Sequence, residues 1–221
     1  MRELFLLQSP RAMEPAQDPR TVLAAVARLF YDRGWMWGTA GNLSLRLADG
    51  SFWITASGKA KGRLTAADFL RIAPGGEVLE RGRPDDRPSA ETSLHDAIYR
   101  LFPQAGACFH VHSIPANVAA RLAGGEDLRL PPLEMLKGLG VWDQDPSVGL
   151  AVFPNHLHVP RIAEELVARF AVAPPEVPGF LIRDHGLTTW GRDAEAALHH
   201  VELFEYIFGY IAAARTAGLD S

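Results

Sequence analysis

Residues 106–113 read Gly-Ala-Cys-Phe-His-Val-His-Ser, and this stretch carries the clearest signal of fold in the chain. The apolar run Gly106–Val111 predicts a short buried strand, and Ser113 is a typical residue to open the helix that follows. Because side chains two residues apart leave the same face of a strand, His110 and His112 are expected to point the same way. Two such imidazoles can hold one divalent cation, but they are equally compatible with core histidines bonded to backbone groups.

Helical and strand patterns alternate on both sides of this strand. The helices are expected at residues 18–34, 89–102, 113–125, 132–139, 159–170 and 193–214. The strands are expected at residues 43–47, 52–55, 150–153, 180–183 and 187–190, with tight turns at Asp49-Gly50 and Gly75-Gly76. This order of elements favours an α/β fold in which helices cover a mixed sheet.

The composition excludes several classes of protein. With 221 residues, 48% of them hydrophobic and 22% charged, the chain is typical of a soluble globular protein, and we expect one domain over residues 18–221. Residues 1–17 lack periodicity and are expected to form a loosely ordered arm. A net charge of −4 without a basic run gives no reason to expect nucleic acid or a membrane as partner. The single cysteine, Cys108, and the lack of a signal peptide predict a cytoplasmic protein.

A third histidine extends the possible metal site. His185 follows another apolar strand in the segment Arg183-Asp184-His185-Gly186, and three protein ligands would leave one position open for catalysis. The remaining histidines lie in helical or loop contexts that favour solvated or hydrogen-bonded side chains: His95, His156, His158, His199 and His200.

Two glutamates are candidates for acid–base chemistry near such a metal. Glu91 lies at the start of a predicted helix, and Glu134 opens another helix after Pro131-Pro132. Each is equally compatible with an ordinary carboxylate that faces a helix dipole, and spacing alone does not choose between them.

Small polar residues beside the predicted strands could bind a phosphate. Exposed backbone N–H groups, hydroxyls and an amide can together surround such an anion, although each residue alone is more typical of a turn. The candidates are Gly41, Asn42, Ser57, Gly58 and Ser89.

Five motifs in this order resemble the class II aldolase/adducin-head superfamily over nearly the whole chain from Phe30 onward. They are GTAGNLSLRL, WITASGKAKGRL, RPSAETSLH, GACFHVHS and LIRDHGLTTWG. Within the superfamily, the segments LEMLKG and Phe153–Asn155 resemble the methylthioribulose-1-phosphate dehydratases of methionine salvage. The resemblance implies a three-layer αβα sandwich around a mixed, mainly antiparallel sheet, a small sugar phosphate as substrate, and a homotetramer with active sites near subunit contacts.

The resemblance also implies roles for particular residues. His110, His112 and His185 match the histidines that bind one Zn²⁺ per subunit in the family, and Glu134 matches the acid/base of the dehydratases. Glu91 falls where the sugar-phosphate aldolases keep a catalytic glutamate. The five small polar residues named above match the phosphate-binding loops.

Three positions depart from the common family pattern, and two other functions stay open. Ala40 precedes Gly41-Asn42, Ala56 replaces a proline, and Asp184 precedes His185, which leaves the exact substrate undetermined. A sugar-phosphate aldolase or epimerase of the fuculose-, rhamnulose- or ribulose-phosphate type would depend on Glu91 rather than Glu134. A non-catalytic adducin-head-like module would have no need of the three histidines.

Overall fold

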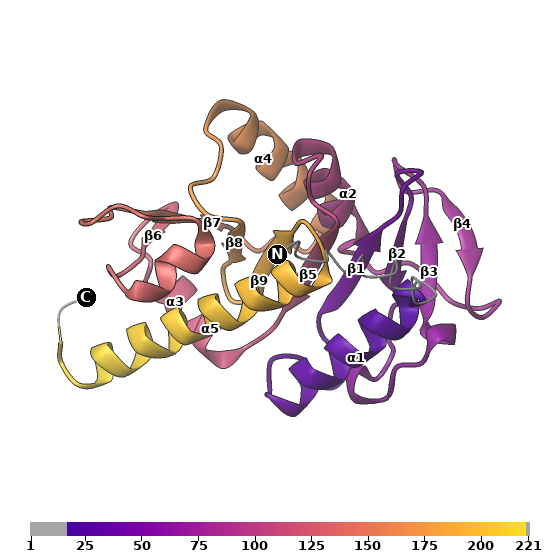
Figure 1. The fold of residues 1–221 in the computed structure, drawn as a ribbon, viewed down its shortest axis with the longest axis horizontal. Helices are drawn as coiled ribbons and strands as arrows, with labels where there is room; N and C mark the ends of the chain where they lie inside the picture. The colour runs from indigo at the N-terminus through magenta and orange to yellow at the C-terminus, as the bar shows by residue number, and fades with distance from the viewer. Residues whose placement is uncertain (1–16, 220–221) are drawn as a thin grey trace, which may run out of the picture.

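A computed structural model describes residues 17–219, through which one nine-stranded sheet runs (Figure 1). Across the sheet the strands are β4 (Val78–Arg81), β3 (Phe69–Ile72), β2 (Phe52–Thr55), β1 (Asn42–Arg46), β5 (Ala107–Val111), β9 (Gly186–Gly191), β8 (Gly179–Ile182), β7 (Gly149–Phe153) and β6 (Asp127–Arg129). Strands β7 and β8 pair in parallel, and all other neighbours in this sheet are antiparallel. The expected mixed, mainly antiparallel sheet is confirmed.

Helices cover both faces of the sheet, which confirms the α/β sandwich (Figure 1). On one face lie α1 (Pro19–Asp32), α3 (Ile114–Leu122) and α5 (Ala194–Thr216), and on the other lie α2 (Thr92–Leu101) and α4 (Val159–Val172). Short 3-10 helices occur in the connections at η1 (Lys61–Arg63), η2 (Ala66–Asp68) and η3 (Glu134–Leu139). None of the helices in the described range has the length and apolar character needed to cross a membrane.

Side-chain caps explain where several helices begin. The carboxylate of Asp18 accepts a hydrogen bond from the Arg20 N–H at the start of α1. Ser113 and Asp193 cap α3 and α5 in the same way, at 3.0 and 2.8 Å. These bonds satisfy backbone donors that have no partner inside the helix, which is why these residue types mark helix starts in the sequence.

Strand β5 lies in the middle of the sheet and separates two hydrophobic cores. Ala107, Phe109 and Val111 pack with α1, α3 and α5, whereas Cys108 packs with α2 and α4. His110 has the same parity as Cys108 and therefore leaves the strand toward α2. The alternation of side chains along β5 thus places His110, a predicted metal ligand, on the face of the sheet that carries α2.

Four elements differ from the expectation. Strands β3, β4 and β6 are additional, and the helix expected at residues 132–139 is the 3-10 helix η3. Strand β4 is largely exposed, so it lacks the alternation of apolar and polar residues that marks a half-buried strand. The predicted arm lies outside the described residues except for residue 17, so its loose order stays a prediction, as does the single domain.

Candidate metal centre

The end of β5 carries two of the predicted metal ligands. His110 is fully buried, and its Nδ1 lies 2.9 Å from the hydroxyl of Thr188 on the neighbouring strand β9. The Nε2 atoms of His110 and His112 lie 2.7 Å apart, so both rings point into the same space. The contact with Thr188 orients the His110 ring and leaves Nε2 as the atom available to a ligand.

The turn between β8 and β9 brings His185 to the same place. Its Nε2 lies 3.3 Å from Nε2 of His110, and its carbonyl accepts a hydrogen bond from the Asn117 side chain at 3.1 Å. Asp184 has a φ of 55°, a left-handed conformation that aspartate tolerates better than most residues. A Cβ on Gly186 would lie 2.1 Å from the Val111 carbonyl oxygen, so the approach of this turn to β5 requires glycine.

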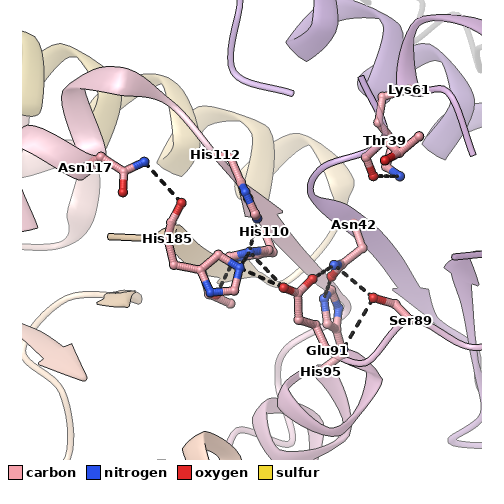
Figure 2. Close-up of polar contacts among 11 residues, drawn as sticks. Thr39, Asn42, Lys61, Ser89, Glu91, His95, His110, His112, Asn117 and His185 are labelled. Carbon is pink, nitrogen blue, oxygen red and sulfur yellow. Dashed lines mark hydrogen bonds and ion pairs between the residues drawn. The ribbon is translucent and has the colours of Figure 1, made fainter. Parts of the chain in front are cut away.

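Glu91, the residue before α2, completes the cluster. Its Oε1 lies 2.8 Å from Nε2 of His185 and 3.6 Å from Nε2 of His110. Its Oε2 accepts a hydrogen bond from the side-chain amide of Asn42 on β1. Figure 2 shows the three imidazoles and this carboxylate converging on one point. The Glu91 side chain therefore faces the histidines and does not cap its own helix.

Burial sets the protonation states of the cluster. Desolvation lowers the pKa of His110 to about 4, against the charge of Glu91, and it lowers the pKa of His112 to about 3. Both rings are therefore neutral at pH 7. Burial alone would raise the pKa of Glu91, but the charge interaction with His110 and the hydrogen bond with His185 outweigh burial and lower this pKa. At pH 7 the cluster therefore combines the neutral imidazoles of His110 and His112 with the ionised carboxylate of Glu91.

This donor set fits one divalent metal ion. All four ligand atoms lie within 4.8 Å of one another. Nitrogen lone pairs that face each other at 2.7 and 3.3 Å repel unless a proton or a cation lies between them. In a tetrahedral zinc site with Zn–N distances of about 2.0–2.1 Å, neighbouring nitrogens lie about 3.3 Å apart, close to the His110–His185 spacing. The four residues thus form a candidate metal centre.

A small cavity adjoins the metal centre. It encloses about 170 Å³, and Glu91 and His112 form part of its wall. All five residues expected in the phosphate-binding loops line it: Gly41, Asn42, Ser57, Gly58 and Ser89. Ala40 and Ala56, which depart from the family pattern, line it too. Metal ligands and predicted phosphate loops therefore share one site.

Lys61 also lines this cavity, and the sequence analysis did not single it out. The side chain is almost fully buried, and Nζ donates to the carbonyl oxygen of Thr39 at 2.8 Å (Figure 2). It also donates to the carbonyl oxygen of Lys59 at 3.1 Å. Lys59, two residues earlier, instead pairs with Asp86 at 2.5 Å. The sequence segment contains both lysines, and only the tertiary structure shows which of them faces the cavity.

His95 is a second residue whose place the sequence did not reveal. It is fully buried in α2, and its Nε2 contacts the amide oxygen of Asn42. The expectation that it is a hydrogen-bonded histidine is confirmed, but its partner belongs to the site. A histidine four residues after Glu91 would be the local signal, because positions i and i+4 lie on the same side of a helix.

Glu134 lies apart from this cluster. Its side chain, at the start of η3, is 79% exposed and pairs with Lys137 at 2.8 Å. The four-residue ligand group found among residues 17–219 does not include it. Seven of the ten predicted site residues therefore line the cavity, and His110 and His185 lie against them. Glu134, the tenth, is not brought there by the fold of a single chain.

Comparison with known sequences gives a consistent family. The family model "Class II Aldolase and Adducin N-terminal domain" matches residues 21–211. A methylthioribulose-1-phosphate dehydratase from Microcystis aeruginosa is 57% identical over 197 residues, which are 89% of this chain and 96% of that protein. A protein of the same name from Leptospira biflexa is 40% identical over 86% of this chain and 94% of its own length.

Solved structures agree with this result. YgbL from Escherichia coli superposes with a TM-score of 0.75 at 27% identity and covers 88% of both chains. The L-fuculose-1-phosphate aldolase from Thermus thermophilus has a TM-score of 0.69 at 26% identity, over 90% of this chain and 95% of its own. The fold, the histidine cluster and the family model agree, and the chain belongs to the class II aldolase and adducin N-terminal domain family.

Proposed function

We propose that this protein is a zinc-dependent lyase that dehydrates 5-methylthioribulose 1-phosphate to 2,3-diketo-5-methylthiopentyl 1-phosphate. The observation that carries the proposal is a four-ligand metal centre that shares its wall with a polar cavity. The choice of substrate is supported by the relatives named methylthioribulose-1-phosphate dehydratase, one of which is 57% identical across almost its whole length.

The metal would be held by the three imidazoles, with Glu91 beside them. Nitrogen-rich donor sets with one carboxylate favour zinc among the common divalent ions, and we propose one Zn²⁺ per subunit. When bound, the ion supplies Lewis-acid stabilisation of negative charge on the oxygens of the substrate. The ionised Glu91, which pairs with His185, keeps a negative charge next to that position.

The cavity beside the metal centre would hold the substrate phosphate. Lys61 supplies a cation, and the hydroxyls of Ser57 and Ser89 and the loop N–H groups supply hydrogen bonds. His112 belongs to both the ligand cluster and the cavity wall, so a bound phosphate would place the adjacent carbons of the ketose next to the metal. This positioning restricts the reaction to one end of the sugar.

The reaction itself requires one base and one acid. Removal of the C3 proton leaves an electron pair that the C2 carbonyl delocalises, and expulsion of the C4 hydroxyl with an added proton releases one water. The resulting enol tautomerises to the diketone, so the net change is the loss of one water. We propose Glu134 as the acid/base, as its match to the LEMLKG segment of the dehydratases implies.

The exposed position of Glu134 fits a role between subunits. We propose a homotetramer with active sites near subunit contacts, in which Glu134 reaches the cluster of a neighbouring subunit. Mixing Glu134→Gln and His112→Ala subunits tests this directly. Each variant alone should be inactive, and a mixed assembly should regain part of the activity because some sites then hold both intact residues. A mixture that stays inactive, although mass spectrometry shows hybrid assemblies, would contradict it.

Mass spectrometry of the products tests the function. The zinc-loaded protein should convert methylthioribulose 1-phosphate to a single product lighter by one water. Cleavage to an aldehyde and a three-carbon phosphate would instead identify an aldolase. That second candidate is favoured by one observation, namely that Glu91, rather than Glu134, lies within the metal cluster. The complete ligand cluster gives no support to a non-catalytic adducin-head-like module, and the cytoplasmic location stays a prediction.

A further inference from the structure

A chain of buried polar side chains runs from the core to the candidate metal centre. Its members are Tyr99, Ser44, His95 and Asn42, all at most 3% exposed, and it ends at Glu91. The Ser44 hydroxyl lies 2.7 Å from the Tyr99 hydroxyl and 2.7 Å from Nδ1 of His95. Nε2 of His95 contacts the amide oxygen of Asn42, whose Nδ2 contacts Oε2 of Glu91. Figure 2 shows the side chains of His95, Asn42 and Glu91 next to one another.

The Glu91 carboxylate determines which atom donates and which accepts in each hydrogen bond of this series of side chains. An ionised carboxylate only accepts hydrogen bonds, so the Asn42 amide group must turn its NH₂ toward Glu91. Its oxygen then faces His95, and this buried contact needs a donor, which is Nε2–H. With its proton on Nε2, the ring presents Nδ1 to the Ser44 hydroxyl as an acceptor.

The remaining protons follow from the same reasoning. Because Nδ1 of His95 is an acceptor, the Ser44 hydroxyl donates to it. The Ser44 oxygen is then free to accept from the Tyr99 hydroxyl. The opposite tautomer of His95 would place a bare Nε2 against the Asn42 oxygen, so that two buried acceptors would face each other. Only one arrangement of the protons therefore gives each of these hydrogen bonds one donor and one acceptor.

We propose that His95 is a positioning residue: its Nε2–H tautomer orients the Asn42 amide, which holds Oε2 of Glu91 and directs Oε1 toward the histidines. Asn42 also lines the cavity next to Ser89, so the same amide forms part of the cavity wall and holds the carboxylate of the metal centre. The consequences for turnover rest on the function proposed above, whereas the tautomer itself does not.

The tautomer can be measured in the intact protein. Long-range ¹H–¹⁵N correlation spectra of ¹⁵N-histidine-labelled protein distinguish protonated from bare ring nitrogens, and a His95→Gln sample identifies the His95 signals. Between pH 6 and 8 we expect a proton on Nε2, which faces the Asn42 oxygen, and none on Nδ1, which faces the Ser44 hydroxyl. A proton on Nδ1, or on both nitrogens, would overturn the proposal whatever the protein catalyses.

Two substitutions at His95 separate positioning from packing. Glutamine can place an N–H where Nε2 lies, whereas asparagine is too short and places its amide near Nδ1. We expect His95→Asn to lower kcat by about 10- to 100-fold, as is typical when a group that orients a ligand is lost, and His95→Gln to retain kcat within about threefold. Bound zinc and the thermal midpoint should be similar in the two variants.

A matched control and three outcomes complete the test. His156→Asn makes the same chemical change at a histidine that bonds Glu165 outside the site, and it should leave kcat unchanged. Equal loss in both His95 variants would show a structural role and overturn the proposal, as would full activity in His95→Asn. If the protein shows no dehydratase activity at all, the proposed function fails, and the spectra still decide the tautomer.

Discussion

The start of α2 and the start of η3 each present a glutamate, yet the two glutamates differ in their exposure to solvent and in the residues that they contact. The Glu91 side chain is 13% exposed and contacts His185, His110 and Asn42. The Glu134 side chain is 79% exposed and contacts Lys137, its own neighbour in the 3-10 helix. One carboxylate is held by the fold of its own chain, and the other is left open to solvent.

This difference shows what a local pattern can predict. Both glutamates open a helix, and both match positions with a catalytic role in the family, so the sequence treats them alike. Strands β1 and β5 bring Asn42 and His110 against Glu91, whereas η3 packs on α5 and keeps Glu134 outside the cluster. The role of each glutamate therefore depends on contacts that lie far apart in the sequence.

The largest effect is expected from breaking the metal centre that both glutamates would serve. His112→Ala removes one of three imidazoles, and bound zinc and turnover should both be lost, by more than the roughly 10- to 100-fold typical of a group that only orients a ligand. Metal analysis and the product assay check this. His156→Ala, at a histidine outside the site, is the control, and retention of zinc by His112→Ala would refute the ligand assignment.

Exchanging each glutamate for glutamine tests the comparison directly. Glu134→Gln should keep its metal while kcat falls by about 10²- to 10⁴-fold, the usual contribution of general acid–base catalysis. Glu91→Gln should instead weaken zinc binding by about 10- to 100-fold in a chelator competition. The reverse result, with turnover lost in Glu91→Gln and nearly normal in Glu134→Gln, would move the acid/base role to Glu91 and favour the aldolase.

The buried ammonium of Lys61 in the cavity is expected to have a smaller effect on activity than the metal ligands. Lys61→Met should lower kcat/KM by about 10- to 150-fold, because a hydrogen bond to a charged group contributes about 1.5–3 kcal/mol. Burial lowers the pKa of Lys61 to about 8, against the charge of Glu91, so the ammonium is present below that pH and lost above it. The kcat/KM of the wild-type protein should therefore fall as the pH rises through about 8.

A neighbouring lysine provides the control for this prediction. Lys61→Met should lack the fall in kcat/KM near pH 8. Lys59→Met should keep kcat/KM and its pH profile but lose stability, because it leaves the buried Asp86 carboxylate without its cation. A pH profile that is the same in wild-type and Lys61→Met proteins would show that Lys61 does not carry this dependence.

The smallest effect is expected on stability at the exposed glutamate. Glu134→Gln should change the free energy of unfolding by less than about 0.5 kcal/mol, because an exposed ion pair between neighbours in a helix contributes little. Denaturant titration measures this. A loss of 2 kcal/mol or more that depends on protein concentration would show that Glu134, besides reaching a neighbouring site, also stabilises the assembly.

Much of the fold was predictable from local signals. Asp18, Ser113 and Asp193 mark helix starts because their side chains accept bonds from unpaired backbone donors. The apolar run before His110 marks a strand because it is buried on both faces. Strand β4 was missed because an exposed edge strand does not need alternating apolar residues, and strand β6 because its three residues are too few to show a strand pattern.

The residue types of the metal centre were determined by the sequence itself, because period-two alternation places His110 and His112 on one face of any strand. Which other groups meet them was decided by the tertiary structure. Antiparallel pairing of β5 with β1 and β9 brings Asn42 and Thr188 beside His110, and the turn after β8 delivers His185. Burial then lowers the pKa values of His110 and His112, because desolvation and charge interactions depend on distance in space and not along the chain.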